Sequence, residues 1–198
     1  LLTGSSFGDA MAAYGALLEG SVGSLRAVSE TLTAATPLML AGLSVALAFR
    51  AGLFNIGGEG QALIGGMFAV WVGFSITGIP IFIHLPLAIL AGIVGGAIWG
   101  FIPGILKAKT GAHEVITTIM LNYIALRLVD FLLKTTMFQR EGRNDPVSKN
   151  IESSAEYPAF LGGIDSALRV HAGLFVALAA AFLIYWLLFR TTIGFEFR

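Results

Sequence analysis

A polar, glycine-rich stretch near the start of the chain separates two apolar runs that carry no charge. Residues 52–61 read GLFNIGGEGQ, whereas residues 31–49 and 62–76 contain no Asp, Glu, Lys or Arg. One carboxylate, two amides and four glycines at membrane depth are costly unless protein or water surrounds them. This interruption therefore predicts a broken helix at 52–61 that lines a path, as the discontinuous helices of transporters do.

The composition places the chain among membrane proteins. Of its 198 residues, 56% are hydrophobic and only 12% are charged, whereas soluble domains carry about 25% charged residues. The net charge of zero gives no electrostatic footprint for nucleic acid. There is no cysteine, and the three histidines lack the spacing of metal ligands. Zinc-hydrolase and nucleotide-binding motifs are also missing, so we expect no catalytic residue, metal site or cofactor in this chain.

Five segments are candidates for membrane-spanning helices, each of which needs about 20 residues. They are 31–49, 58–76, 84–106, 113–134 and 170–189. The second qualifies only if its polar start is sheltered, and the fourth is mixed in polarity. We therefore predict an all-α, polytopic membrane helix bundle that forms part of one transmembrane domain over 1–198. The chain starts without Met and ends soon after an apolar run, so we expect it to be incomplete at both ends.

Basic residues predict the orientation of these spans. Lys107 and Lys109 close one span and Arg190 follows another, which places both ends on the cytoplasmic side. The chain must cross once more between these two ends, so residues 113–134 are expected to span. Residues 139–166, which mix acidic and basic side chains, then form a loop outside the membrane.

One span carries a small residue at every fourth position. These residues are Ala88, Gly92, Gly96, Gly100 and Gly104. The four-residue spacing places them on one helix face, where they let a second helix approach closely. An abundance of glycine and alanine in membrane helices offers a simpler explanation, but five in register favour a packing face.

The interruption contributes the first group of candidate path or gate residues, Asn55, Glu59 and Gln61. A helix that begins near residues 57–58 would direct its free backbone N–H groups at the glycine-rich turn. Its positive dipole end would then favour an anion or polar substrate oxygens, with Asn55 as an N-cap. The alternative is that these side chains only satisfy one another and cap the helix.

A second group, Glu114, Thr118 and Asn122, falls at i, i+4 and i+8 of the span 113–134. This spacing makes a polar stripe on one helix face. The stripe is a further candidate for lining a path or supporting a gate. Hydrogen bonding between helices is the alternative explanation.

Four stretches together resemble one family. Residues 52–61 resemble the signature of permeases from ABC importers of nucleosides and simple sugars, a superfamily that includes ribose and branched-chain amino-acid permeases. Residues 35–43 (ATPLMLAGL) resemble the helix before that signature. Residues 111–124 (GAHEVITTIMLNYI) resemble its second motif, in which Asn commonly replaces His113. Residues 190–198 (RTTIGFEFR) resemble the stretch leading into the cytoplasmic coupling region.

The resemblance implies a permease subunit, not an enzyme, that imports a nucleoside or simple sugar by alternating access. It implies a multi-pass protein of a bacterial or archaeal plasma membrane. The implied partners are a second permease subunit, two ATPase subunits that bind ATP-Mg, and an extracytoplasmic substrate-binding protein. Two alternatives remain open: an ion-coupled secondary transporter that uses Glu59 and Glu114, and a structural membrane subunit of a larger complex.

Overall fold

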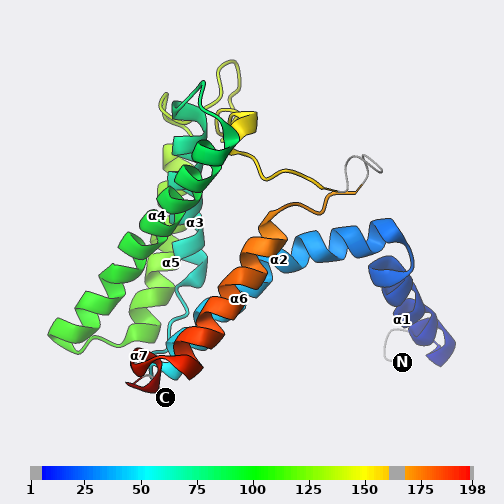
Figure 1. Ribbon diagram of the computed structural model, residues 1–198, viewed down its shortest axis with the longest axis horizontal. Helices are drawn as coiled ribbons and strands as arrows, with labels where there is room; N and C mark the ends of the chain where they lie inside the picture. Colours follow the sequence, from blue (N-terminus) through cyan, green and yellow to red (C-terminus); the bar gives the residue numbers. More distant parts are fainter. Residues whose placement is uncertain (1–5, 161–167, 197–198) are drawn as a thin grey trace. The chain divides into compact units, whose positions relative to one another are not determined.

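A computed structural model describes residues 6–160 and 168–196 (Figure 1). Contacts divide the chain into two compact units. Unit 1 comprises the described residues within Leu1–Leu43 and Tyr157–Phe195, and unit 2 those within Ser44–Glu156 together with Glu196. The elements are α1 (Phe7–Val22), α2 (Leu25–Arg50), α3 (Gly58–Ser75), α4 (Ile81–Thr110), α5 (Glu114–Leu132), the 3₁₀-helix η1 (Ser153–Ala155), α6 (Gly173–Arg190) and α7 (Thr192–Glu196).

The all-α prediction is confirmed, since helices are the only regular elements among the described residues, which otherwise form turns, loops and two isolated β-bridges. Four helices, α2, α4, α5 and α6, are long and apolar enough to cross a membrane. They overlap four of the five expected spans, including 113–134, the span of mixed polarity. The fifth, α3, forms at the expected place but is not among these four, because Glu59 and Gln61 in its first turn lower its hydropathy.

Unit 1 contains a helix that the hydropathy pattern did not reveal. Helix α1 begins after Ser6, whose side chain accepts a hydrogen bond from Asp9 N while the Asp9 carboxylate accepts one from Ser6 N. This reciprocal capping box satisfies backbone N–H groups in the first turn and so stabilises the start of the helix. Helix α2 also begins at Leu25, ahead of the expected start at residue 31. Part of the expected outside loop 139–166 lies outside the described residues.

Helices α3, α4 and α5 lie side by side in unit 2 (Figure 1). The backbones of α3 and α4 come close at Gly65, where a Cβ atom would lie 2.7 Å from the Gly92 carbonyl oxygen. A Cβ on Gly96 would lie 3.3 Å from the Gln61 carbonyl oxygen, and one on Gly100 would lie 3.1 Å from Gln61 Nε2. Gly104, by contrast, has open space around it. Gly92, Gly96 and Gly100 therefore face α3, whereas Gly104 does not.

His84, in the first turns of α4, was given no role by its sequence context. It is fully buried, with Nε2 3.2 Å from the Val72 carbonyl oxygen and Nδ1 2.7 Å from Ser154 Oγ. A carbonyl only accepts, so Nε2 carries the proton and Nδ1 accepts from the serine hydroxyl. The ring thereby fastens η1 to α3 and α4, helped by the hydrogen bond from Glu152 N to Gly73 O.

Candidate functional site

The interruption occupies residues 51–57, between α2 and α3. Gly52 has a φ of 71°, a left-handed conformation that favours glycine. Its N–H bonds Phe49 O at 3.1 Å, and the next N–H, of Leu53, bonds Ala48 O at 2.9 Å, so both residues close the end of α2. After a non-helical stretch, α3 begins at Gly58, as the glycine pattern predicted. The interruption predicted at 52–61 therefore extends only to residue 57.

Asn55 is not the N-cap that the sequence suggested, because Gly57 holds that position. The Asn55 side chain instead accepts a hydrogen bond from Gly57 N at 2.8 Å. Such a local side chain-to-backbone bond folds the chain into a turn before the helix. Asn55 thus shapes the entry to α3 from two residues upstream.

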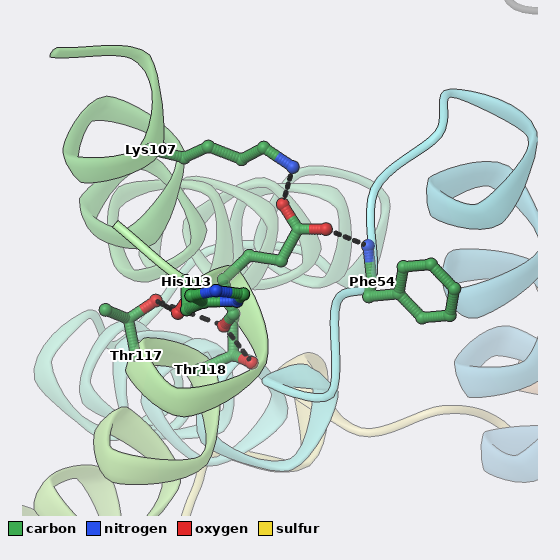
Figure 2. Close-up of polar contacts among 6 residues, drawn as sticks. Phe54, Lys107, His113, Thr117 and Thr118 are labelled. Carbon is green, nitrogen blue, oxygen red and sulfur yellow. Dashed lines mark hydrogen bonds and ion pairs between the residues drawn. The ribbon is translucent and has the colours of Figure 1, made fainter. Parts of the chain in front are cut away.

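Glu114 is the first residue of α5, and its two carboxylate oxygens contact the interruption and the end of α4. Its partners Phe54 and Lys107 are labelled in Figure 2. Oε1 accepts a hydrogen bond from Phe54 N at 2.8 Å. Oε2 forms an ion pair with Lys107 near the end of α4. The Glu114 side chain is 14% exposed and that of Lys107 is 41% exposed, so the carboxylate lies mostly out of solvent while its partners remain accessible.

Thr118 lies one turn further along the same face of α5. It is buried, and its hydroxyl donates to the Glu114 carbonyl oxygen at 2.7 Å (Figure 2). Its carbon atoms face the interruption, since a Cβ on Gly57 would lie 3.1 Å from Thr118 Cβ. Thr118 therefore contributes shape, and its hydroxyl is used within its own helix.

Asn122 completes the stripe and binds the chain on both sides of Gly57. Its Nδ2 donates to the Ile56 carbonyl oxygen at 2.9 Å. Its Oδ1 accepts from Gly60 N, also at 2.9 Å, in the first turn of α3. Both polar atoms of this amide are therefore engaged with backbone groups that would otherwise lack a partner.

The stripe predicted at i, i+4 and i+8 is thus the surface on which the interruption lies. Glu114 binds it at Phe54, Thr118 packs at Gly57, and Asn122 binds it at Ile56 and also binds Gly60 in the first turn of α3. All three residues contact backbone atoms. This geometry supports the alternative of hydrogen bonding between segments, and whether any of the three also contacts a solute stays a prediction.

Glu59 and Gln61 differ from the stripe. Glu59 is exposed and has no hydrogen-bond partner among the described residues. It borders a surface hollow of about 400 Å³ together with Ile56, Ile119, Asn122, Tyr123 and Leu126. Gln61 packs along Gly96 and Gly100 of α4. Of the six candidates, Glu59 is therefore the most available for a contact with something outside this chain.

A second hollow, of about 340 Å³, separates the interruption from the end of α4. Asn55, Glu114, Thr118 and Lys107 border it, and so does Gly104. The open space found at Gly104 is this hollow. Three of the candidate residues therefore come together around one space that sequence spacing alone could not place.

Trp99 of α4 was not singled out from the sequence. Its indole nitrogen is buried and has no hydrogen-bond partner among the described residues. It lies 2.9 Å from the position that a Cβ on Gly60 would occupy. Glycine at position 60 therefore leaves room for both the indole and the Asn122 amide. No group of three potential metal ligands occurs in the described part of the chain.

Several helices that are long and apolar enough to cross a membrane, together with a polar interruption between two helices, are characteristic of a multi-pass membrane protein. The family model for the permease component of branched-chain amino acid transport systems matches residues 27–198, and the chain belongs to this family.

Three curated relatives are similar to this chain over most of its length. The guanosine ABC transporter permease protein NupP of Bacillus subtilis (strain 168) is 46% identical over 185 residues, which cover 93% of this chain and 52% of the relative. The nucleoside ABC transporter permease protein NupB of Lactococcus lactis is 39% identical, with coverages of 93% and 52%. The glucose ABC transporter permease protein TsgB13 of Haloferax volcanii is 39% identical, with coverages of 95% and 50%.

The chain spans about half the length of these curated relatives. No solved structure matches it.

Proposed function

We propose that the chain is part of the permease subunit of an ATP-driven importer that translocates a nucleoside, with a simple sugar as the next candidate. One structural observation carries the proposal: the polar interruption of an apolar chain is tethered to α5 by Glu114 and Asn122. A membrane anchor has no need of a non-helical polar segment, whereas a path for a polar solute does. The relatives support the choice of solute, since they include guanosine, nucleoside and glucose permeases.

The proposed assembly contains a second permease subunit, two ATPase subunits and an extracytoplasmic substrate-binding protein in a bacterial or archaeal plasma membrane. ATP-Mg binds to the ATPase subunits, so this chain carries out no hydrolysis. Binding and hydrolysis of ATP shift the permease between conformations that open the path to one side at a time. The family to which the chain belongs supports this arrangement.

Within this chain, the interruption and the first turn of α3 would present polar groups along the path. Glu59 is exposed beside the hollow bordered by Asn122 and Tyr123, so its carboxylate can accept hydrogen bonds from the hydroxyl groups of a sugar. Asn55, Glu114 and Thr118 border the second hollow. The contacts of these three side chains stabilise the shape of the interruption, so the side chains have few polar atoms left to bind a solute.

The proposal is tested by nucleoside uptake into vesicles that contain the full-length permease, its ATPase subunits and its binding protein. Uptake is expected to require ATP inside the vesicle and to continue when a protonophore removes the proton gradient. An ion-coupled secondary transporter gives the opposite pattern. Uptake of glucose in place of nucleoside would select the simple-sugar candidate, and uptake of neither would overturn the proposal.

Glu59→Gln and Glu59→Ala separate a mechanistic role of the interruption from a structural one. Gln keeps the side-chain shape while removing the charge, so it should fold normally and transport poorly if the charge takes part in the cycle. If Glu59 only supports the helix start, Gln should transport normally and Ala should lower the protein yield. Normal uptake by both variants and by Asn55→Ala would remove the interruption from the mechanism and favour a purely structural subunit.

A further inference from the structure

We propose that Glu114 and Asn122 are positioning residues that make residues 54–60 and α5 a single moving body, with a joint to α2 at Gly52. The inference rests on the proposed function for its transport readout. It differs from a path-lining role because neither residue needs to contact the solute. Both act through backbone atoms of the interruption.

The first support is the distribution of hydrogen bonds along residues 52–60, which comprise the interruption and the first turn of α3. The N–H groups of Gly52 and Leu53 bond α2, at Phe49 O and Ala48 O. From Phe54 onward, the contacts pass to α5: Phe54 N bonds Glu114, Ile56 O bonds Asn122, and Gly60 N bonds Asn122. The change of partner occurs between Leu53 and Phe54.

The second support is the packing between these two attachment points. Gly57 lies against Thr118, with a Cβ-to-Cβ separation of 3.1 Å if residue 57 had a side chain. Two hydrogen-bonded points with a close contact between them leave the segment little freedom to slide along α5. The segment therefore has a fixed register on the stripe.

The joint lies where the chain can turn. Gly52 has a φ of 71° and no atom within 4 Å of where a Cβ would be. Glycine changes φ and ψ at low cost, and open space lets it do so without a clash. The Phe49 and Phe54 rings, with centroids 5.2 Å apart, meet across the joint. An apolar ring contact can slide, whereas the hydrogen bonds to α5 have to break.

The experiment uses the full-length permease assembled with its ATPase subunits and freed of other cysteines. Spin labels are placed at Ile56 and Tyr123, two exposed side chains that border one hollow. A second pair joins Tyr123 to Ala46, an exposed residue of α2. The distance between residues 56 and 123 should stay unchanged between nucleotide-free and ATP-bound states, while the distance between 46 and 123 should change.

Matched substitutions at Glu114 test the role of its carboxylate. Glu114→Gln keeps an oxygen that can accept from Phe54 N, so the 56–123 distance should stay narrow and uptake should remain within about threefold of the unsubstituted protein. Glu114→Ala removes the acceptor, so the same distance distribution should broaden and uptake should fall about tenfold. Asn122→Ala should act in the same direction.

Three results would overturn the inference: a 56–123 distance that changes with nucleotide in the unsubstituted protein, an unchanged 46–123 distance, or a narrow 56–123 distance in both alanine variants. If an alanine variant is not recovered from membranes, the two distances measured in the unsubstituted protein with and without ATP still test the inference. Absence of nucleoside uptake would count against the proposed function alone, because the distances are measured without any solute.

Discussion

Helix α3 is held to α4 and to α5 by different kinds of contact. Against α4, glycines bring two backbones together, and a Cβ on Gly65 would lie 2.7 Å from the Gly92 carbonyl oxygen. Against α5, the Asn122 amide joins backbone groups of Ile56 and Gly60. The first contact depends on the absence of side-chain atoms, and the second depends on the presence of two polar ones.

This difference determines what each interface tolerates. A glycine interface in a membrane is stabilised by dispersion between close surfaces, so added volume disrupts it while polarity matters little. A side chain that satisfies backbone groups does the reverse: a shape-matched apolar replacement leaves an N–H and a C=O without partners. Substitutions that change only volume or only polarity should therefore separate the two interfaces.

Asn122→Leu is expected to have the largest effect. Leucine has a similar size but no polar atoms, so the part-buried Gly60 N–H loses its partner, at about 1–3 kcal/mol. The exposed Ile56 C=O also loses its hydrogen bond to the amide, at a smaller cost because solvent can reach it. The melting temperature and yield of the purified permease should fall clearly. Met120→Leu, at an exposed position of the same helix, is the control and should behave like the unsubstituted protein. Equal melting temperatures for both variants would show that the Asn122 tether does not stabilise unit 2.

The two interfaces also differ in how far the sequence predicted them. Small residues at every fourth position indicate a packing face, and their spacing predicted that Gly92, Gly96 and Gly100 would contact a neighbouring helix. Gly104 shares that spacing but borders a hollow, because α3 does not extend opposite it. Gly95, outside the pattern, meets Phe68 instead. Spacing identifies a face, whereas the length of the partner helix decides which part of it is covered.

The sequence indicated the polar stripe on α5, but it did not indicate which segment the stripe contacts. Glu114, Thr118 and Asn122 share a helix face by spacing alone, yet they contact the backbone of residues 54–60. Backbone groups are the same in every residue, so no sequence pattern marks which of them a side chain will bind. For the same reason, the sequence did not predict the hydrogen bond between His84 and the Val72 carbonyl oxygen. The order and type of most elements were predicted, whereas these long-range polar contacts required the structure.

Gly65→Ala should have the next largest effect, this time at the α3–α4 interface. The new methyl group would press on the Gly92 carbonyl oxygen, a backbone atom that cannot move without shifting the helix. Overpacking of this kind costs about 1–3 kcal/mol. Gly66→Ala is a matched control, since Gly66 belongs to the same helix and has no atom within 4 Å of a Cβ position. Unfolding in detergent should occur at a lower temperature for Gly65→Ala only, and identical curves would contradict a close contact.

Gly100→Ala is expected to have the smallest effect of the three. A Cβ there would lie 3.1 Å from Gln61 Nε2, the end of a flexible side chain that can move aside. Alanine also favours a helix over glycine by about 1 kcal/mol, which offsets the strain. Gly104→Ala adds a methyl group to open space, so it should gain the helix preference without the strain. The melting temperature of Gly104→Ala should therefore exceed that of Gly100→Ala. The opposite order would mean that Gln61 is not packed against α4, and that the glycine face extends to Gly104 as the spacing alone had predicted.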